Sequence, residues 1–227
     1  VLCTGNSCRS IMAEGLINHF GKDDFQAFSA GSKPTGYVHP MSIKILKKSG
    51  YDSVGVKSSS DLECLDGLVL PGGESTTMSL LIDSFNLRDS LLDFSKNKPI
   101  LGTCAGLILM AKNIENELKV NPLGIFDITV DRNAYGSQIM SKKEKISMKF
   151  DSKLIDFEVT LIRAPKIKGM GNEIQVLLEL DDSPIAIYNG MHMGLSFHPE
   201  LNGVTLFHDS LFGGSVNSNF QALGNIN

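Results

Sequence analysis

One cysteine of this chain lies in a sharp turn bounded by glycines. Cys104 is at the centre of the sequence Gly-Thr-Cys-Ala-Gly at 102–106, which follows the apolar segment 99–101 and precedes the apolar run 107–114. A strand-to-helix turn of this kind exposes a nucleophile, and the start of the helix favours the thiolate. The pattern predicts a catalytic cysteine, although a buried cysteine among small residues can also serve packing alone.

A histidine and a glutamate near the end of the chain have the spacing of a base and its partner. A nucleophilic thiol needs a general base, and the base needs an acceptor that fixes its tautomer. His198 and Glu200 belong to the sequence Ser-Phe-His-Pro-Glu, and residues i and i+2 of an extended segment face the same side. Cys104, His198 and Glu200 are therefore predicted to form a catalytic triad.

A glycine-rich turn offers a third part of a site. Residues 70–77 read Leu-Pro-Gly-Gly-Glu-Ser-Thr-Thr, and a Gly-Gly turn at the end of a strand exposes backbone N–H groups that can hold an oxyanion or a carboxylate. Gly72 and Gly73 form this turn. Glu74 could bind an ammonium group, and Ser75 could cap the next helix. Such glycines can also mark no more than a tight turn.

Taken together, these segments resemble one family. The stretches 65–78, 102–108, 131–136, 162–165 and 196–201 follow the order found in the glutaminase subunits of pyridoxal 5′-phosphate synthase, which are class I glutamine amidotransferases. The resemblance covers about residues 62 to 210. It implies an α/β fold, a three-layer sandwich with a largely parallel central sheet.

The resemblance also implies a reaction and the residues that carry it. Cys104 would attack the side-chain amide of L-glutamine, with His198 as base and Glu200 orienting it. The glutamine would be bound by Gly72, Gly73, Glu74, Ser75, Arg132, Ile162 and Arg163. The ammonia would pass to a pyridoxal 5′-phosphate synthase subunit in a hetero-oligomer, and no cofactor is implied.

A second cysteine motif lies at the start of the sequence. Cys3 and Arg9 are separated by five residues, a spacing that wraps backbone N–H groups and a guanidinium around a tetrahedral oxyanion. With residues 12–15 and 29–31, this string resembles low-molecular-weight tyrosine phosphatases and arsenate reductases over about residues 1 to 61. That resemblance implies Cys3 as a nucleophile and Arg9 as the clamp of a possible oxyanion loop.

Both resemblances are partial. The chain contains no Asp-Pro pair to supply the acid of such phosphatases, and Cys64 and Cys104 are too far apart in sequence for the disulfide relay of the reductases. The glutaminase family begins with a β-α-β unit and a Gln-Gly loop before residue 65, and here the phosphatase-like β-α-β-α segment replaces them. We expect that this segment could lie on the central sheet in place of the lost unit.

The pattern of apolar residues predicts alternating strands and helices. Helices are expected at 40–49, 78–92 and 107–114, and strands at 65–70, 99–101, 128–130, 157–162, 174–180, 186–188 and 194–197. The lysine run 142–145 is expected in a solvated loop, and His208 in a frayed last helix. The expected divisions are a phosphatase-like segment at 1–61, a glutaminase domain at 62–212 and a flexible tail at 213–227.

Composition excludes several classes of protein. The 227 residues are 42% hydrophobic and 20% charged with a net charge of −4, which suits a soluble globular protein and favours neither nucleic acid nor a membrane surface as partner. The apolar runs are too short to cross a bilayer, and the first residues lack a signal segment, so a cytoplasmic location is expected. Cysteine spacing predicts neither a disulfide framework nor a metal site.

Three functions remain open from the sequence. The chain could be a glutaminase that serves a pyridoxal 5′-phosphate synthase. It could be an arsenate reductase or low-molecular-weight tyrosine phosphatase that uses Cys3 and Arg9, or an inactive hybrid or partner-binding chain. Alkylation of Cys104 by a glutamine analogue would favour the first, and protection of Cys3 by phosphate or arsenate the second.

Overall fold

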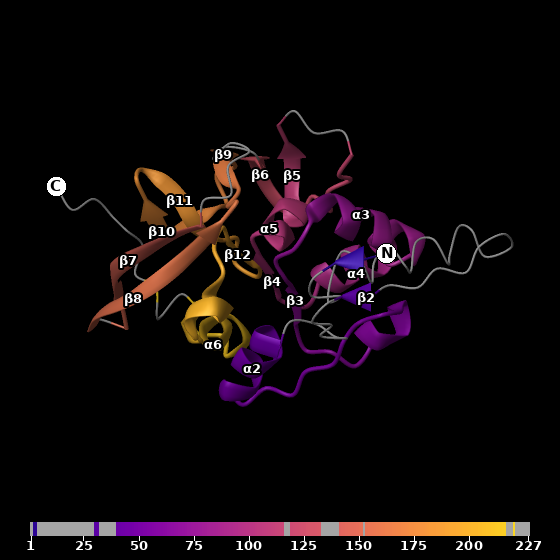
Figure 1. Ribbon diagram of the computed structural model, residues 1–227, viewed down its shortest axis with the longest axis horizontal. Helices are drawn as coiled ribbons and strands as arrows, with labels where there is room; N and C mark the ends of the chain where they lie inside the picture. The colour runs from indigo at the N-terminus through magenta and orange to yellow at the C-terminus, as the bar shows by residue number, and fades with distance from the viewer. Residues whose placement is uncertain are drawn as a thin grey trace, which may run out of the picture.

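A five-stranded sheet forms the centre of the molecule (Figure 1). The structure is a computed structural model that describes residues 2–3, 30–31, 40–115, 119–132, 141–151, 153–216 and 220. The sheet has the order β10-β11-β12-β4-β3, with β3 (Leu68–Leu70), β4 (Ile100–Thr103), β10 (Gln175–Leu180), β11 (Ser183–Tyr188) and β12 (Met193–Leu195). Strands β12, β4 and β3 run parallel, and β10, β11 and β12 are antiparallel neighbours. The α/β class expected from the sequence is confirmed.

This sheet separates two hydrophobic cores, because successive side chains of a strand point to opposite faces. Ile100 of β4 packs into one core and its neighbour Leu101 into the other. The first core takes the buried side chains of α3 (Ser75–Ser84), α4 (Arg88–Ser95) and α5 (Ala105–Met110), and the second takes those of α6 (Leu206–Phe212). Helices on both faces give the three layers of the expected sandwich.

The helical pattern in the sequence runs on past the true helix ends at two places. The helix predicted at 78–92 is divided into α3 and α4, with Asn86 in a left-handed conformation at a φ of 53° between them. The helix predicted at 107–114 stops at Met110, because Ala111 takes an extended ψ of 157°. No helix in the described ranges is long and apolar enough to cross a membrane.

Residues 111–114 instead begin a second, three-stranded sheet. It consists of β5 (Ala111–Ile114), β6 (Phe126–Asp131) and β9 (Lys166–Met170). Strand β5 pairs in parallel with β6, which pairs antiparallel with β9. Lys112 and Asn113 are exposed on β5, so the apolar face that predicted a longer helix ends at Ala111.

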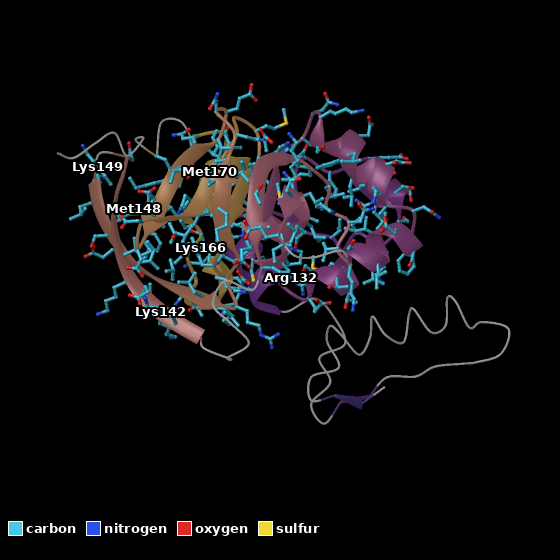
Figure 2. All side chains as sticks on the ribbon, turned by 90° about the horizontal axis from the view of Figure 1, so that it is seen from above. Arg132, Lys142, Met148, Lys149, Lys166 and Met170 are labelled. Atoms are coloured by element: carbon cyan, nitrogen blue, oxygen red, sulfur yellow. The ribbon has the colours of Figure 1, made fainter. Side chains whose placement is uncertain are left out.

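A long hairpin forms at the end of the molecule opposite α3 and α4 (Figures 1 and 2). Its strands are β7 (Ser141–Phe150) and β8 (Lys153–Ile162). The loop predicted for the lysine run 142–145 is therefore wrong, because these residues belong to β7. Ile146 and Met148 of β7 are buried against the second core, while Lys142 forms ion pairs with Glu144 and Asp181.

The segment before β3 packs on the same body as the strands that follow it. It contains α2 (Pro40–Lys48) and the short 3-10 helix η1 (Ser59–Leu62). Figure 1 shows α2 beside α6, and the Tyr51 and Phe212 rings meet edge to face at 5.8 Å. Val56 packs against the first core, in which Leu62 is buried. Residues on both sides of the division predicted between 61 and 62 thus contact one core.

The two described strands nearest the N-terminus pair with each other. β1 (Leu2–Cys3) and β2 (Ala30–Gly31) form a parallel two-stranded sheet of their own. Among the described residues, β3 is the edge strand of the central sheet, and neither β1 nor β2 extends it. The described strands of the N-terminal segment therefore do not take the place on the central sheet that the sequence suggested for them.

The first part of the predicted flexible tail is packed. Within 213–227, Val216 and Phe220 are buried in the second core. The Phe220 ring stacks on Phe207 at 5.7 Å and meets Phe150 edge to face at 5.2 Å. The expectation of a flexible tail therefore does not hold at Val216 and Phe220, because their apolar side chains are buried in the second core. Residues 217–219 and 221–227 lie outside the described ranges.

The histidine expected in a frayed helix is instead buried in α6. His208 is 3% exposed, and its Nδ1 has no hydrogen-bond partner among the described residues. Burial lowers the pKa of His208 from 6.5 to about 4, against the opposing effect of the carboxylates of Glu200 and Asp209. A buried polar atom without a partner costs stability, so this position is a weak point of the fold.

Replacement of His208 by phenylalanine is expected to stabilise the protein, most of all at acid pH. Because the folded pKa lies below the unfolded value, the histidine leaves stability unaffected above about pH 6.5 and costs stability as the pH falls towards 4. The full penalty is about 3 kcal/mol. Thermal unfolding between pH 7 and 4.5 measures it: His208→Phe should flatten the fall in Tm, and parallel curves for both proteins would contradict the assignment.

Candidate active site

Cys104 lies where β4 passes into α5, in the turn that the sequence predicted. It has a φ of 50° and a ψ of −102°, a conformation that side chains rarely adopt. Its backbone N–H donates to the Leu195 carbonyl at 2.8 Å, which ties the turn to β12. A Cβ atom at residue 106 would overlap the Leu70 carbonyl, so the second glycine of the motif allows α5 to pass close to β3. The nucleophile turn is thus held by both neighbouring strands.

His198 and Glu200 meet Cys104 at this end of the sheet. Nδ1 of His198 lies 2.8 Å from Oε1 of Glu200. Cys104 is near enough to influence the pKa of the His198 ring. Burial alone would lower the pKa of His198, but the hydrogen bonds and charges of Cys104 and Glu200 outweigh it and raise the pKa to about 10. His198 is therefore paired with Glu200, as the sequence predicted, and the triad with Cys104 stays a prediction.

Gly72 fits against the imidazole of His198. A Cβ atom at residue 72 would overlap Cε1 of that ring and lie 3.0 Å from its Nδ1. The first glycine of the predicted turn therefore provides space for the histidine. This steric role was not foreseen from the sequence, which suggested backbone N–H donors alone.

Glu74 caps the next helix and binds Arg132. Its carboxylate accepts hydrogen bonds from the backbone N–H groups of Thr76 and Thr77, at 3.2 and 2.7 Å, and from the Thr77 hydroxyl at 2.7 Å. Nη2 of Arg132 lies 3.1 Å from the same carboxylate. Burial raises the pKa of Glu74, but the hydrogen bonds from Thr77 and Thr76 outweigh it, so the pKa is lower than usual. Glu74, and not Ser75, is the cap.

Ile162 is the last residue of β8, beside the nucleophile, and Arg163 follows it. Sγ of Cys104 lies 3.6 Å from the Ile162 carbonyl oxygen. Arg163 is exposed and has a left-handed φ of 46°. A strained, non-glycine residue next to a catalytic group is typical of functional sites. Ser75, by contrast, is 3% exposed at the start of α3.

Comparison with known proteins shows the family of this chain. Residues 38–213 match the model of the SNO glutamine amidotransferase family. The chain belongs to this family. The resemblance stated from the sequence motifs is confirmed, and the amidotransferase is an enzyme.

Curated relatives of this amidotransferase cover most of its length. Pyridoxal 5′-phosphate synthase subunit PdxT of Oenococcus oeni is 48% identical over 167 residues, which are 74% of this chain and 86% of that protein. Subunit PdxT of Fervidobacterium nodosum is 43% identical over 73% of this chain and 85% of that protein. A solved structure described as a glutamine amidotransferase superposes with a TM-score of 0.70 at 32% identity, covering 77% of this chain and 93% of that one.

A second family model matches the N-terminal segment of the amidotransferase. Residues 1–65 match low molecular weight phosphotyrosine protein phosphatase, so the two models overlap over 38–65. Cys3 is in β1, and Arg9 lies outside the described residues, so the possible oxyanion loop has no described geometry. In the described part of the chain, no group of three or more histidine, cysteine, aspartate or glutamate residues could hold a metal ion.

Some residues of the site carry no signal in the sequence. The Thr160 carbonyl accepts from the backbone N–H of His198 at 3.0 Å, and its hydroxyl donates to Oδ1 of Asn202 at 2.7 Å. Neither residue lies in the motifs at Cys104 or His198, and they are 42 positions apart. The left-handed Gly203, which ends the turn after Glu200, is the one local sign that this segment stops sharply.

Proposed function

We propose that this chain hydrolyses the side-chain amide of L-glutamine and supplies the ammonia to a pyridoxal 5′-phosphate synthase subunit. The observation that carries the proposal is the 2.8 Å pairing of His198 with Glu200, together with the strained strand-to-helix turn that holds Cys104. Names printed for the relatives support the biosynthetic role, since both curated proteins are subunits of pyridoxal 5′-phosphate synthase.

The reaction begins with a thiolate. The raised pKa of His198 favours an imidazolium at neutral pH, with Glu200 stabilising the positive charge. Sulfur attacks the amide carbon, and the imidazolium gives its proton to the departing amine, which leaves as ammonia. A water molecule then loses a proton to His198 and attacks the thioester, which releases glutamate and restores the thiolate beside the imidazolium.

The remaining predicted residues would bind the substrate. Gly73 offers a backbone N–H to the oxyanion beside the His198 ring, and Arg163 offers a guanidinium to the glutamine carboxylate next to the Ile162 carbonyl. Gly72 leaves room for the ring. Glu74 and Arg132 form an ion pair, so in this proposal they shape the glutamine site together with Ser75 by holding the first turn of α3.

Ammonia release from purified chain tests the proposal. L-glutamine is compared with L-asparagine, with and without a pyridoxal 5′-phosphate synthase subunit, and Cys104 is labelled with a diazoketone analogue of glutamine and located by peptide mass spectrometry. We expect glutamine-specific release that increases with the synthase subunit, and labelling at Cys104. A folded chain that releases no ammonia in either condition, and whose Cys104 stays unlabelled, would overturn the proposal.

The match over residues 1–65 favours a second candidate, an oxyanion-binding or phosphatase activity at Cys3 and Arg9. The sequence has no Asp-Pro pair to protonate a leaving group. Oxyanion binding at Cys3 and Arg9 is therefore favoured over catalytic turnover there. Hydrolysis of a phosphotyrosine peptide or reduction of arsenate, lost in Cys3→Ser, would support it. If Cys104 does not react with the glutamine analogue, and Cys3 acts on neither the phosphotyrosine peptide nor arsenate, the inactive-hybrid hypothesis is favoured.

A further inference from the structure

The short helix that carries Glu200 is tied to the β7–β8 hairpin by one side chain. This helix is η2 (Pro199–Asn202). Oδ1 of Asn202 accepts from the Thr160 hydroxyl at 2.7 Å, and Nδ2 donates to Oε1 of Glu158 at 2.8 Å. Asn202 therefore uses both ends of its amide to bind β8.

Thr160 holds both ends of the segment that contains the base and its acceptor. Its carbonyl accepts from the His198 backbone N–H at 3.0 Å, while its hydroxyl binds Asn202. Glu200 lies midway between these two attachments. Thr160 is 5% exposed, and a buried hydroxyl without a partner would cost stability, so this contact is a built part of the fold.

The same strand also lies against the nucleophile. Ile162, two residues beyond Thr160 on β8, presents its carbonyl oxygen 3.6 Å from Sγ of Cys104. The end of β8 thus contacts Cys104 through the Ile162 carbonyl and His198 through the Thr160 carbonyl. It is linked to the helix that carries Glu200 through Asn202. A displacement of about 1 Å in such an arrangement can cost about 100-fold in rate.

We propose that Asn202 is a positioning residue, which through Thr160 and Glu158 holds Glu200 at hydrogen-bond distance from Nδ1 of His198. The inference rests on the proposed glutaminase function. Asn202 touches neither the substrate nor the reacting atoms in this account. It acts by fixing the direction of η2, which has only four residues and depends on its attachments for a defined orientation.

A donor swap tests the role. Asn202→Asp keeps the acceptor for the Thr160 hydroxyl but sets a carboxylate against Glu158, and like charges repel. In the double variant Asn202→Asp/Glu158→Gln, the new amide at 158 can donate to the new carboxylate at 202, which restores the bridge with its donor and acceptor exchanged. Thr160→Val removes only the hydroxyl and is a second, independent variant. Asn172→Asp, in the exposed turn after β9, is the matched control.

The first measurement is the pH dependence of Cys104 alkylation by iodoacetamide, followed on the Cys104 peptide by mass spectrometry. A displaced Glu200 no longer stabilises the imidazolium, so alkylation of Asn202→Asp at pH 6 should be about tenfold slower, which corresponds to a shift of one pH unit. Thr160→Val should shift in the same direction. The double variant should regain the parent profile, and Asn172→Asp should keep it.

The second measurement is glutamine hydrolysis. We expect kcat of Asn202→Asp to fall about tenfold with KM unchanged, and to recover in the double variant, because the lost interaction affects the transition state alone. Parent-like alkylation in both Asn202→Asp and Thr160→Val, or a double variant no better than a folded Asn202→Asp, would overturn the inference. A parent that hydrolyses no glutamine refutes the proposed function alone, since the alkylation profile needs no turnover.

Discussion

Cys104→Ala is expected to lower kcat for glutamine hydrolysis by about 10⁴-fold or more, because a nucleophile removed from a triad leaves only binding and oxyanion stabilisation. Alanine fits the site, since the substitution deletes one sulfur atom from a side chain that is 6% exposed. The turn conformation is set by the backbone bond to Leu195 and by the close approach of α5 to β3, which the substitution leaves intact. Glutamine should therefore still bind.

Cys64→Ala is the matched control for this experiment. It makes the same chemical change at an exposed cysteine after η1 that is not part of the predicted triad. Ammonia release should be unchanged in Cys64→Ala and lost in Cys104→Ala, and glutamine binding to Cys104→Ala can be followed by calorimetry. Undiminished turnover in Cys104→Ala would assign the nucleophile to another thiol and remove the basis of the proposed mechanism.

The nucleophile turn was predictable from sequence because its causes are local. Gly102 and Gly106 are required where the chain turns between β4 and α5, and both lie within two residues of Cys104. The pairing of His198 with Glu200 was also predicted, but its structural reason is different. Glu200 lies in the 3-10 helix η2 that begins directly after His198, and not in an extended segment. Short-range constraints of this kind leave a pattern in the sequence that does not depend on the rest of the fold.

Where helix and strand compete, the sequence alone was insufficient. The run 107–114 is apolar enough for a helix, yet its second half pairs with β6, whose residues lie more than ten positions away. The lysines of 142–145 resemble a solvated loop, but pairing with β8 and burial of Ile146 and Met148 place them in a strand. Tertiary pairing overrides local preference in both cases.

The polar contacts around the site were also beyond sequence reasoning. Glu74 and Arg132 are 58 positions apart in the sequence. They form an ion pair because the fold brings the end of β6, which Arg132 follows, beside the start of α3. The sequence suggested that Glu74 could bind the ammonium group of a ligand, which assumes that its carboxylate has no partner in the protein. In the structure the first turn of α3 and a guanidinium already surround it, so its carboxylate serves the helix. Contacts of this range are decided by the fold, and a single sequence does not reveal them.

Gly72→Ala is expected to lower kcat by about 100-fold, because the new methyl group would occupy the position of the His198 ring. The ring is held by its hydrogen bond to Glu200, so it can move away only by breaking that bond. Gly72 has no left-handed φ that would forbid alanine, and the loss therefore measures the steric contact alone. Stability should change far less than the rate.

Gly55→Ala separates this steric effect from a general effect of replacing glycine. A Cβ atom at residue 55 would meet nothing within 4 Å, so the variant should keep the parent kcat and KM. If Gly72→Ala is folded and turns over glutamine at the parent rate, the imidazole can leave its observed position without loss, and its contact with Cys104 is not the reacting arrangement. If the rate falls while Cys104 alkylation also shifts to higher pH, the methyl group has separated the base from the nucleophile. The turn at 72 is then required for the space it leaves, independently of any hydrogen bond from its backbone.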